Sequence, residues 1–449
     1  MIKTPRGLAV EILNRVASTD AYAEPLLDAC LSNHALANIH DRRLLTELVY
    51  GALRKQGHLD WIIGVYYRGD INSLDIFVKN ILRTGLYQLL YTSRIPSFAV
   101  VDEAVKLTKT HHPRSAGLVN AILRNYLRKG EGLTYPRLEE EPVEYLSVVH
   151  SHPRWLVERW LKIFGLEDTT ALCVANNEIP PITLRVNGMK LTRESASGEL
   201  ATDNIVAKET VFSPHGLVIA RHGPSLREMA SYQKGHIILQ DEASQLIGLL
   251  TAPQPGEKVL DLCAGTGVKT THLSEIMDNK GKITAVDINK GKLVSLRALA
   301  DRMGAENVDT EVGDATTNMG PSWQGQFDRV VVDAPCSGLG TVRRNPEIKW
   351  RLQAHDLKSF SQLQKQILHS AAACLKRGGT LVYSVCTILP EENEAVIDDF
   401  LKHHSAFCLV SPPESINPTF IDKRGFFRTN TALHGTDGFF GAVMVREQH

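Results

Sequence analysis

Two cysteines occupy positions that a covalent catalyst would need. Cys336 follows an apolar run in DAPCSGLG (333–340), and Cys386 ends the next such run, just before TILPEENE (387–394). Most cysteines are small buried hydrophobic residues, but these two lie where a strand passes into a loop, the place where ligands bind in an open sheet. A thiolate is a strong nucleophile, and covalent catalysis replaces one difficult step by two easier ones. We therefore predict that both thiols reach one ligand site if the two strands are neighbours.

A turn with two glycines, DLCAGTGVK (261–269), follows an earlier apolar run and leads into a helix. Glycines let the backbone approach a ligand at the start of a helix, where free amides attract negative groups. Asp287 ends the next predicted strand, and Asp314 follows the strand after that. Carboxylates at such strand ends can bind ribose hydroxyls, so the pattern favours a nucleotide-type ligand.

The turn fits neither of two common phosphate-binding patterns. A P-loop needs GxxxxGK[ST], but Val268 precedes Lys269, and the dinucleotide fingerprint needs a third glycine where this chain has Thr270. An NAD-dependent dehydrogenase is disfavoured for this reason, and it would leave both cysteines unexplained. A nucleoside with an amino-acid tail, such as S-adenosylmethionine, has no pyrophosphate and needs fewer close backbone contacts, so this turn favours a ligand of that kind.

Two thiols beside a methyl donor point to chemistry at carbon 5 of cytosine. That carbon is a poor nucleophile, but addition of a thiolate to carbon 6 turns the ring into an enamine that can attack a methyl sulfonium. Loss of the carbon-5 proton and elimination of the thiol then restore aromaticity. A free thiol with a pKa of about 8.5 is mostly protonated at neutral pH, so the nucleophile needs a positive neighbour such as Lys269.

These residues need a sheet that gathers several strand ends. Apolar runs alternate with helical periods over five segments: 258–263, 282–288, 309–313, 328–335 and 380–386. This alternation predicts a parallel, doubly wound sheet with ligands at the carboxyl ends of its strands.

Two helix boundaries are also predicted in this region. The helix over 357–375 is expected to end at Lys376, Arg377 and Gly378, which suit the end of a helix. Pro390 is expected to open a further helix, with the two glutamates that follow it in the first turn.

The whole chain of 449 residues suggests about three domains. Residues 1–130 show apolar positions at helical spacing and predict a bundle of about six to eight helices. Residues 131–150 are acidic and contain proline, which predicts a linker or a boundary helix. Residues 151–236 predict a small α/β region, and residues 237–449 contain the candidate site.

Composition excludes several classes of protein. With 43% hydrophobic and 22% charged residues, the chain is expected to be globular. Seven cysteines are too few and too irregularly spaced for a disulfide scaffold, and none has zinc-ligand spacing, so no metal is expected. The chain lacks a secretory leader pattern and a long apolar run, so a cytoplasmic protein without membrane contact is expected. The first 130 residues hold 17 Lys and Arg against 11 Asp and Glu, which is a weak indication of nucleic acid.

The motifs resemble those of the RNA cytosine-C5 methyltransferases of the NOL1/NOP2/Sun family. The similarity is carried by DAPCSGLGTVRRNPEIKW (333–350), YSVCTILPEENE (383–394) and HGTDGFFGAVMV (434–445). Segments 41–63 and 116–128 resemble the NusB-type helical domain of bacterial members that act on 16S rRNA. The resemblance covers nearly the whole chain and implies an all-α NusB-like bundle, a small α/β middle region resembling an RNA-recognition domain, and a C-terminal Rossmann-like class I methyltransferase domain.

The resemblance also implies roles for single residues. Cys386 would be the nucleophile that attacks cytosine, Cys336 would assist its release, and Lys269 and Asp333 would face the target base. S-adenosylmethionine would be bound by the glycine turn and by three strand ends, through Cys263, Ala264, Gly265, Thr266, Gly267, Val268, Lys269, Asp287, Asp314 and Asp333.

This chain departs from the family's usual motifs at three positions. The usual CAAPGGKT reads CAGTGVKT here, with Thr266 in place of proline and Val268 in place of glycine. Val385 replaces the usual threonine before the second cysteine. These changes bear on cofactor affinity rather than on the type of reaction.

The implied partner is 16S rRNA, either naked or in an early small-subunit particle, and a monomeric protein is expected. A target cytosine must be unpaired or flipped out of its helix. Basic residues in two clusters are predicted to form a track for phosphates: Arg42, Arg43, Arg54, Lys55, Arg343, Arg344 and Lys349. Binding through such contacts is expected to weaken steeply with salt.

Two other functions remain open from the sequence. A non-catalytic RNA-binding or ribosome-assembly factor could keep this fold, although a pure binder needs neither cysteine loop. A methyltransferase with the same chemistry could instead act on another RNA, such as tRNA. Fold alone does not decide between these functions.

Overall fold

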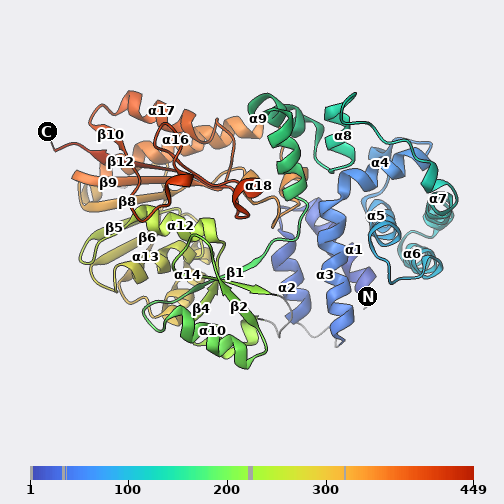
Figure 1. Ribbon diagram of the computed structural model, residues 1–449, viewed down its shortest axis with the longest axis horizontal. Helices are drawn as coiled ribbons and strands as arrows, with labels where there is room; N and C mark the ends of the chain where they lie inside the picture. Colours follow the sequence, from blue (N-terminus) through green and yellow to red (C-terminus); the bar gives the residue numbers. More distant parts are fainter. Residues whose placement is uncertain (1–3, 33–35, 37, 221–225, 318–319, 449) are drawn as a thin grey trace. The chain divides into compact units, whose positions relative to one another are not determined.

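Figure 1 shows a computed structural model of the chain, which describes residues 4–32, 36, 38–220, 226–317 and 320–448. The chain forms two compact units. One consists of Met1–Ile179 together with Val342–Ala354, and the other of Pro180–Thr341 together with His355–His449. In the part of the chain that the structure describes, no helix is long and apolar enough to cross a membrane.

The first unit is helical, as predicted, with leucines and other apolar residues at helical spacing packed into one core. Its first helix illustrates the local signals, because Thr4 accepts a hydrogen bond from the amide of Gly7 and Pro5 occupies the first turn. The helices of this unit are α1 (Pro5–Ser18), α2 (Ala23–Ser32), α3 (Ile39–Arg54), α4 (Gln56–Tyr66), α5 (Ile76–Tyr91), α6 (Ser97–His111), α7 (Ala116–Lys129), α8 (Pro142–Val148), α9 (Arg154–Ala175) and α15 (Ile348–Arg351).

The short segment Val342–Ala354 is part of this helical unit, although it follows the first cysteine loop in sequence. Trp350 Nε1 donates a hydrogen bond of 2.7 Å to the carbonyl of Leu53. Glu347 Oε1 accepts one of 2.8 Å from the amide of Ala23. The segment therefore contacts helices whose residues lie 297 and 324 positions earlier in the chain.

The second unit begins with a small antiparallel sheet in the order β2-β3-β1-β4. Its strands enclose a core with the helix that follows β1, in which Leu184, Leu200 and Leu217 are buried. The elements are β1 (Ile182–Val186), α10 (Arg193–Thr202), β2 (Val206–Glu209), β3 (Gly216–Ala220), α11 (Ala230–Gln233) and β4 (Ile237–Leu239).

The large sheet of this unit has the order β10-β12-β9-β8-β5-β6-β7, with β11 paired to β12. Strands β5 to β9 pair in parallel, as predicted, whereas β12 runs antiparallel to β9, β10 and β11. The elements are α12 (Glu242–Thr251), β5 (Lys258–Leu262), α13 (Val268–Ile276), β6 (Lys282–Asp287), α14 (Lys290–Met303), β7 (Val308–Val312), β8 (Phe327–Asp333), α16 (Asp356–Cys374), β9 (Leu375–Val385), α17 (Glu394–His403), β10 (Phe407–Val410), β11 (Phe427–Arg428), α18 (Thr431–His434) and β12 (Phe440–Arg446).

Helices cover both faces of this sheet, so its central strands are apolar on both sides (Figure 1). Val330 and Val332 of β8 pack in one core with α16 and α17. Val331, between them, points to the other face and packs with α13. This alternation explains why the central strands appear in the sequence as continuous apolar runs.

The predicted end of the long helix is wrong. Helix α16 ends at Cys374 and passes directly into β9, so Lys376, Arg377 and Gly378 lie within the strand. Leu375 already pairs with Phe327 of β8, and its carbonyl accepts a hydrogen bond of 2.6 Å from Arg446 Nη1. These tertiary partners, absent from the local sequence, draw the residues into the sheet.

Candidate active site

The side chains of Cys336 and Cys386 lie next to each other, as predicted. Strands β8 and β9 are parallel neighbours in which Asp333 pairs with Ser384. Cys336 lies three residues beyond β8, and Cys386 directly follows β9. Their Sγ atoms are 3.3 Å apart, both thiols are free, and both side chains are only partly buried. The pair can therefore contact one ligand.

A close backbone approach holds the two cysteine loops together. The amide of Gly340 donates a hydrogen bond of 3.0 Å to the carbonyl of Cys386, and the amide of Gly438 donates one of 2.8 Å to the carbonyl of Gly340. A Cβ atom at position 340 would clash with the carbonyl of Gly438, so this contact requires glycine. The loop before β12 thus supports the loops after β8 and β9.

Sequence analysis missed the role of Glu392. This residue is fully buried, and its carboxylate accepts hydrogen bonds of 2.8 Å from the amide of Ser337 and 2.9 Å from Gln364 Nε2. It also accepts one of 3.2 Å from Thr387 Oγ1. Helix α17 begins only at Glu394, so the prediction that Glu391 and Glu392 form its first turn is wrong. Glu392 instead ties both cysteine loops to α16.

Lys269 and Asp333 form an ion pair at the site, with Nζ 2.6 Å from Oδ2. The other carboxylate oxygen of Asp333 accepts a hydrogen bond of 2.8 Å from Ser384 Oγ. Burial alone lowers the pKa of Lys269, but the charge and hydrogen bond of Asp333 outweigh it, and the negative charge of Cys386 also contributes, so the pKa is raised overall. Lys269 is therefore a fixed cation beside the thiols.

The surroundings of Cys336 keep its thiol protonated. Its hydrogen bond with Cys386 and then its burial raise the pKa of Cys336 well above the usual value, and the charge of Glu392 acts in the same direction. A thiol with a raised pKa is a poor nucleophile but can give or share a proton.

The glycine turn has the strained backbone that a close ligand approach requires. Gly265 and Gly267 have φ of 60° and 88°, in the left-handed region, and Cys263 has φ of 67°. Ala264 donates its amide to the carbonyl of Val286, and Thr266 is exposed at the tip of the turn. Burial and the charge of Asp261 raise the pKa of Cys263, so its thiol stays neutral.

The predicted aspartates lie at neighbouring strand ends. Asp287 ends β6, where its Oδ2 accepts a hydrogen bond of 3.0 Å from the amide of Gly265 and its Oδ1 one of 2.8 Å from the amide of Asn289. Each carboxylate oxygen has a second lone pair, so Asp287 can still accept from a ligand hydroxyl. Asp314 follows β7 and is exposed, with Oδ1 bonded to Thr316.

Asp261 at β5 is a buried group that sequence analysis did not single out. Its Oδ2 accepts a hydrogen bond of 2.7 Å from Thr270 Oγ1 in the first helix turn after the glycines. Burial, partly offset by this hydrogen bond, raises the pKa of Asp261 to about 7. Asp261 thus links the strand to the helix on either side of the turn.

The three departures from the usual motifs have simple structural settings. Val385 is fully buried in the core beneath the cysteines, where a methyl group packs as well as a hydroxyl. Val268 is the first residue of α13, and its carbonyl accepts a hydrogen bond of 2.8 Å from Arg185 Nη1. Thr266 has no close packing to disturb, because its side chain is exposed.

The predicted basic track is wrong for three of its members. Arg54, Arg343 and Lys349 are buried, and Lys349 Nζ donates a hydrogen bond of 3.1 Å to the carbonyl of Arg54. Burial lowers the pKa of Lys349 well below its usual value. These residues lie inside the helical unit, whereas Arg43 is exposed and Arg42, Lys55 and Arg344 are partly exposed.

Most of the chain matches known protein families. Residues 248–445 match the family described as 16S rRNA methyltransferase RsmB/F, residues 3–128 the NusB family, and residues 152–225 the ferredoxin-like domain of RsmF/B-like methyltransferases. The chain is 35% identical to a probable ribosomal RNA small subunit methyltransferase B of Bacillus subtilis, covering 98% of both chains. This chain belongs to the RsmB/F family.

A second relative and a solved structure also support membership of the RsmB/F family. The ribosomal RNA small subunit methyltransferase B of Pseudomonas syringae pv. tomato is 37% identical and covers 98% of this chain and 97% of its own. The solved structure of PH0851 superposes with a TM-score of 0.85 at 31% identity, covering 98% of this chain and 99% of that one. The predicted fold, a NusB-like helical domain, a small middle domain and a C-terminal methyltransferase domain, is confirmed. The RsmB/F match contains every residue of the candidate site.

Proposed function

We propose that this protein transfers a methyl group from S-adenosylmethionine to carbon 5 of one cytosine in 16S rRNA, through a bond between Cys386 Sγ and carbon 6 of the ring. The observation that carries the proposal is the distance of 3.3 Å between the Sγ atoms of Cys336 and Cys386 at adjacent strand ends. The relatives named as small-subunit rRNA methyltransferases support the substrate class.

The two thiols take complementary roles in this reaction. Cys386 lies beside the Lys269 cation, which stabilises a thiolate, so it forms the bond to carbon 6 and moves electrons onto carbon 5. Cys336 is a neutral thiol in hydrogen-bond contact with Cys386. It gives its proton to the departing sulfur and takes up the proton that carbon 5 loses, which restores both the ring and the enzyme.

The glycine turn and the strand ends fit S-adenosylmethionine, which supplies an electrophilic methyl group when bound. Gly265 and Gly267 leave the backbone open at the start of α13, and Asp287 keeps lone pairs for ribose hydroxyls. Asp333 and Lys269 neutralise each other, so the site can accept a cofactor that carries both a cation and a carboxylate. The residues that we assign to the cofactor thus surround one sheet edge.

We assign RNA contact to the helical domain over 1–130 and to the middle region over 151–236, with 131–150 as their linker and 237–449 as the catalytic domain. Exposed cations such as Arg43 can contact phosphates, whereas the buried Arg54 and Lys349 cannot. RNA affinity is therefore expected to fall with salt, with a slope set by the exposed basic residues alone.

Methyl transfer to defined RNAs tests this function. The full-length protein is incubated with methyl-labelled S-adenosylmethionine and either naked 16S rRNA, small-subunit particles or tRNA, and modified cytosines are mapped. We expect 5-methylcytosine at one position of 16S rRNA and none in tRNA. Labelling of tRNA alone would assign the same chemistry to another substrate. RNA binding without any transfer to these RNAs would favour the non-catalytic assembly factor.

A further inference from the structure

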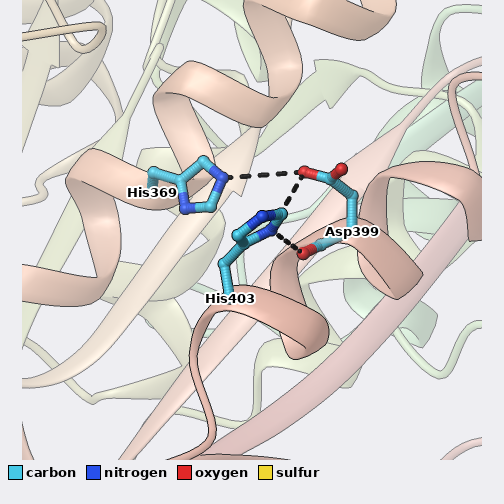
Figure 2. Close-up of side chains that lie close together, drawn as sticks. All are labelled: His369, Asp399 and His403. Carbon is cyan, nitrogen blue, oxygen red and sulfur yellow. Dashed lines mark hydrogen bonds and ion pairs between the residues drawn. The ribbon is translucent and has the colours of Figure 1, made fainter.

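Three potential metal ligands, contributed by α16 and α17, lie close together (Figure 2). His369 belongs to α16, and Asp399 and His403 belong to α17. Asp399 Oδ2 lies 3.7 Å from His369 Nε2 and 3.7 Å from His403 Nδ1. One ligand atom from each of the three side chains lies within 4.8 Å of the others.

The packing of the two helices fixes this arrangement. Asp399 and His403 are four residues apart on α17, so they lie on the same side of the helix. Val396 and Phe400 of α17 are buried in the core that α16 shares, which holds the two helices against one another. The cluster itself is accessible to solvent. The exposed fractions of the side chains of His369, Asp399 and His403 are 36%, 30% and 57%.

Neighbouring groups orient the ligands without filling the space between them. His369 Nδ1 lies 2.6 Å from Nε2 of His404, so Nε2 is the nitrogen that His369 directs at Asp399. His403 Nδ1, the nitrogen 3.7 Å from Asp399 Oδ2, also lies 2.7 Å from the backbone oxygen of Asp399, so a rotation of the ring must release it before it binds an ion. Lys365 Nζ is 3.2 Å from Asp399 Oδ1, on the other oxygen of the carboxylate. Metal-binding histidines commonly have a partner on the second ring nitrogen, as His369 has in His404.

We propose that His369, Asp399 and His403 bind a divalent transition-metal ion of the zinc type, with water as the fourth ligand. Two imidazoles and a carboxylate are a ligand set that zinc accepts. Ligand atoms about 2 Å from a tetrahedral ion lie roughly 3.3 Å from one another. The present separations of up to 4.8 Å need only side-chain rotations to close.

An ion here would fasten α16 to α17. Gln364, one turn before His369, donates to Glu392 and to the carbonyl of Pro335 in the cysteine loops. Helix α17 follows the Cys386 loop after a short turn. The ion would therefore stabilise the two helices that support the active site without touching the reacting groups. No spacing pattern in the sequence indicates this set, because His369 and Asp399 are 30 residues apart and belong to different helices.

Zinc titration of the metal-free, full-length protein tests the site, with a coloured chelator as competitor. The variants are the double substitution His369→Gln with His403→Gln, the single Asp399→Asn, and the control His355→Gln, which removes an exposed histidine next to α16. We expect the wild type and the control to bind one zinc equivalent that both cluster variants bind at least about tenfold more weakly. Zinc should also raise the melting temperature of the wild type and the control only.

A separate titration is needed to distinguish the histidine cluster from the thiols, because Cys336 and Cys386 could also bind zinc. The titration is repeated with Cys336→Ser, which should keep the zinc equivalent assigned to the histidines. Equal zinc binding by the wild type and both cluster variants would overturn the proposal, and so would loss of that equivalent in Cys336→Ser. Circular dichroism of the metal-free variants, expected to match the wild type, shows that weaker binding reflects lost ligands. A cluster variant that lost its zinc equivalent only because it had unfolded would also count against the assignment.

Discussion

At the scale of single residues, the two thiols differ in what surrounds them. Cys386 faces the Lys269 ammonium, which Asp333 holds in place at 2.6 Å. Cys336 instead has a raised pKa, caused by its hydrogen bond to Cys386 and by burial. In the reaction that we propose, these surroundings suit two different tasks: Cys386 attacks as a thiolate, and Cys336 gives and takes up a proton.

Asp261 gives a residue-scale prediction for pH dependence. Burial raises its pKa from 3.8 to about 7 in the folded protein. The folded state therefore binds this proton more tightly, and the stability it contributes is complete below about pH 4 and lost as pH rises through 7. The variant Asp261→Asn cannot ionise at this position and so does not lose this stability. The unfolding free energy of the variant minus that of the wild type should therefore increase from pH 5 to pH 8. Each unit of pKa difference corresponds to about 1.4 kcal/mol.

Urea unfolding of both proteins at several pH values measures this difference. Thr270→Val is the matched control, since it removes the hydroxyl that donates to Asp261 but keeps the carboxyl group. The control should retain the pH dependence that Asp261→Asn loses. A difference between Asp261→Asn and the wild type that stays constant from pH 5 to pH 8 would contradict the assignment.

At the scale of elements, the site depends on three loops that pack backbone against backbone. Gly340→Ala places a Cβ against the carbonyl of Gly438 and 3.0 Å from the carbonyl of Cys386. Both neighbours are main-chain atoms, so the loops must move apart. A displacement of about 1 Å can lower a rate roughly a hundredfold, so we expect methyl transfer to fall by about this factor. Initial rates with 16S rRNA measure the effect.

Gly132→Ala serves as the matched control for that substitution, because Gly132 lies in the segment 131–150, outside the regions assigned to RNA and to the cofactor. An added Cβ at position 132 meets nothing within 4 Å, so its rate should equal that of the wild type. Equal rates for Gly340→Ala and Gly132→Ala would show that the loop contact does not position the cysteines.

The elements also show what the sequence could predict. Strands β8 and β9 could be found because a parallel strand buried on both faces is a continuous apolar run, and their cysteines followed from the position of strand ends. The direction of β12 could not be found, because an equally apolar run carries no sign of orientation. Glu392 was missed for a related reason. A glutamate after a proline suits the first turn of a helix, and only the tertiary fold brings Gln364 to it.

At the scale of the whole molecule, the chain leaves the catalytic unit after the Cys336 loop, contributes Val342–Ala354 to the helical unit, and then returns. Sequence analysis placed this segment in the catalytic domain. The sequence predicts that Arg54 and Lys349 belong to a basic track for phosphates, whereas the structure buries both of them. The carbonyl group of Arg54 that accepts the hydrogen bond from Lys349 belongs to the distant helix α3, and no local sequence pattern indicates this contact.

Trp350→Ala tests the structural role of this segment. Trp350 donates a hydrogen bond to the carbonyl of Leu53, and its ring leaves no room for a side chain at Gly57. Its loss should destabilise the helical unit by about 3 kcal/mol, the usual cost of truncating a large packed aromatic residue. Hydrogen exchange in the full-length protein should speed up at the end of α3 and the start of α4, and should stay unchanged in β8 and β9. Faster exchange in β8 and β9 alone would contradict this role.

The central claim is that Cys386 bonds to cytosine and that Cys336 is needed to release it. Denaturing electrophoresis of full-length variants incubated with 16S rRNA and S-adenosylmethionine tests this directly. Cys336→Ala should accumulate a covalent protein–RNA adduct that resists denaturation, whereas Cys386→Ala and the double variant should form no adduct and transfer no methyl group. An adduct in Cys386→Ala but not in Cys336→Ala would exchange the two roles, and methyl transfer by Cys386→Ala at the wild-type rate would contradict the covalent mechanism.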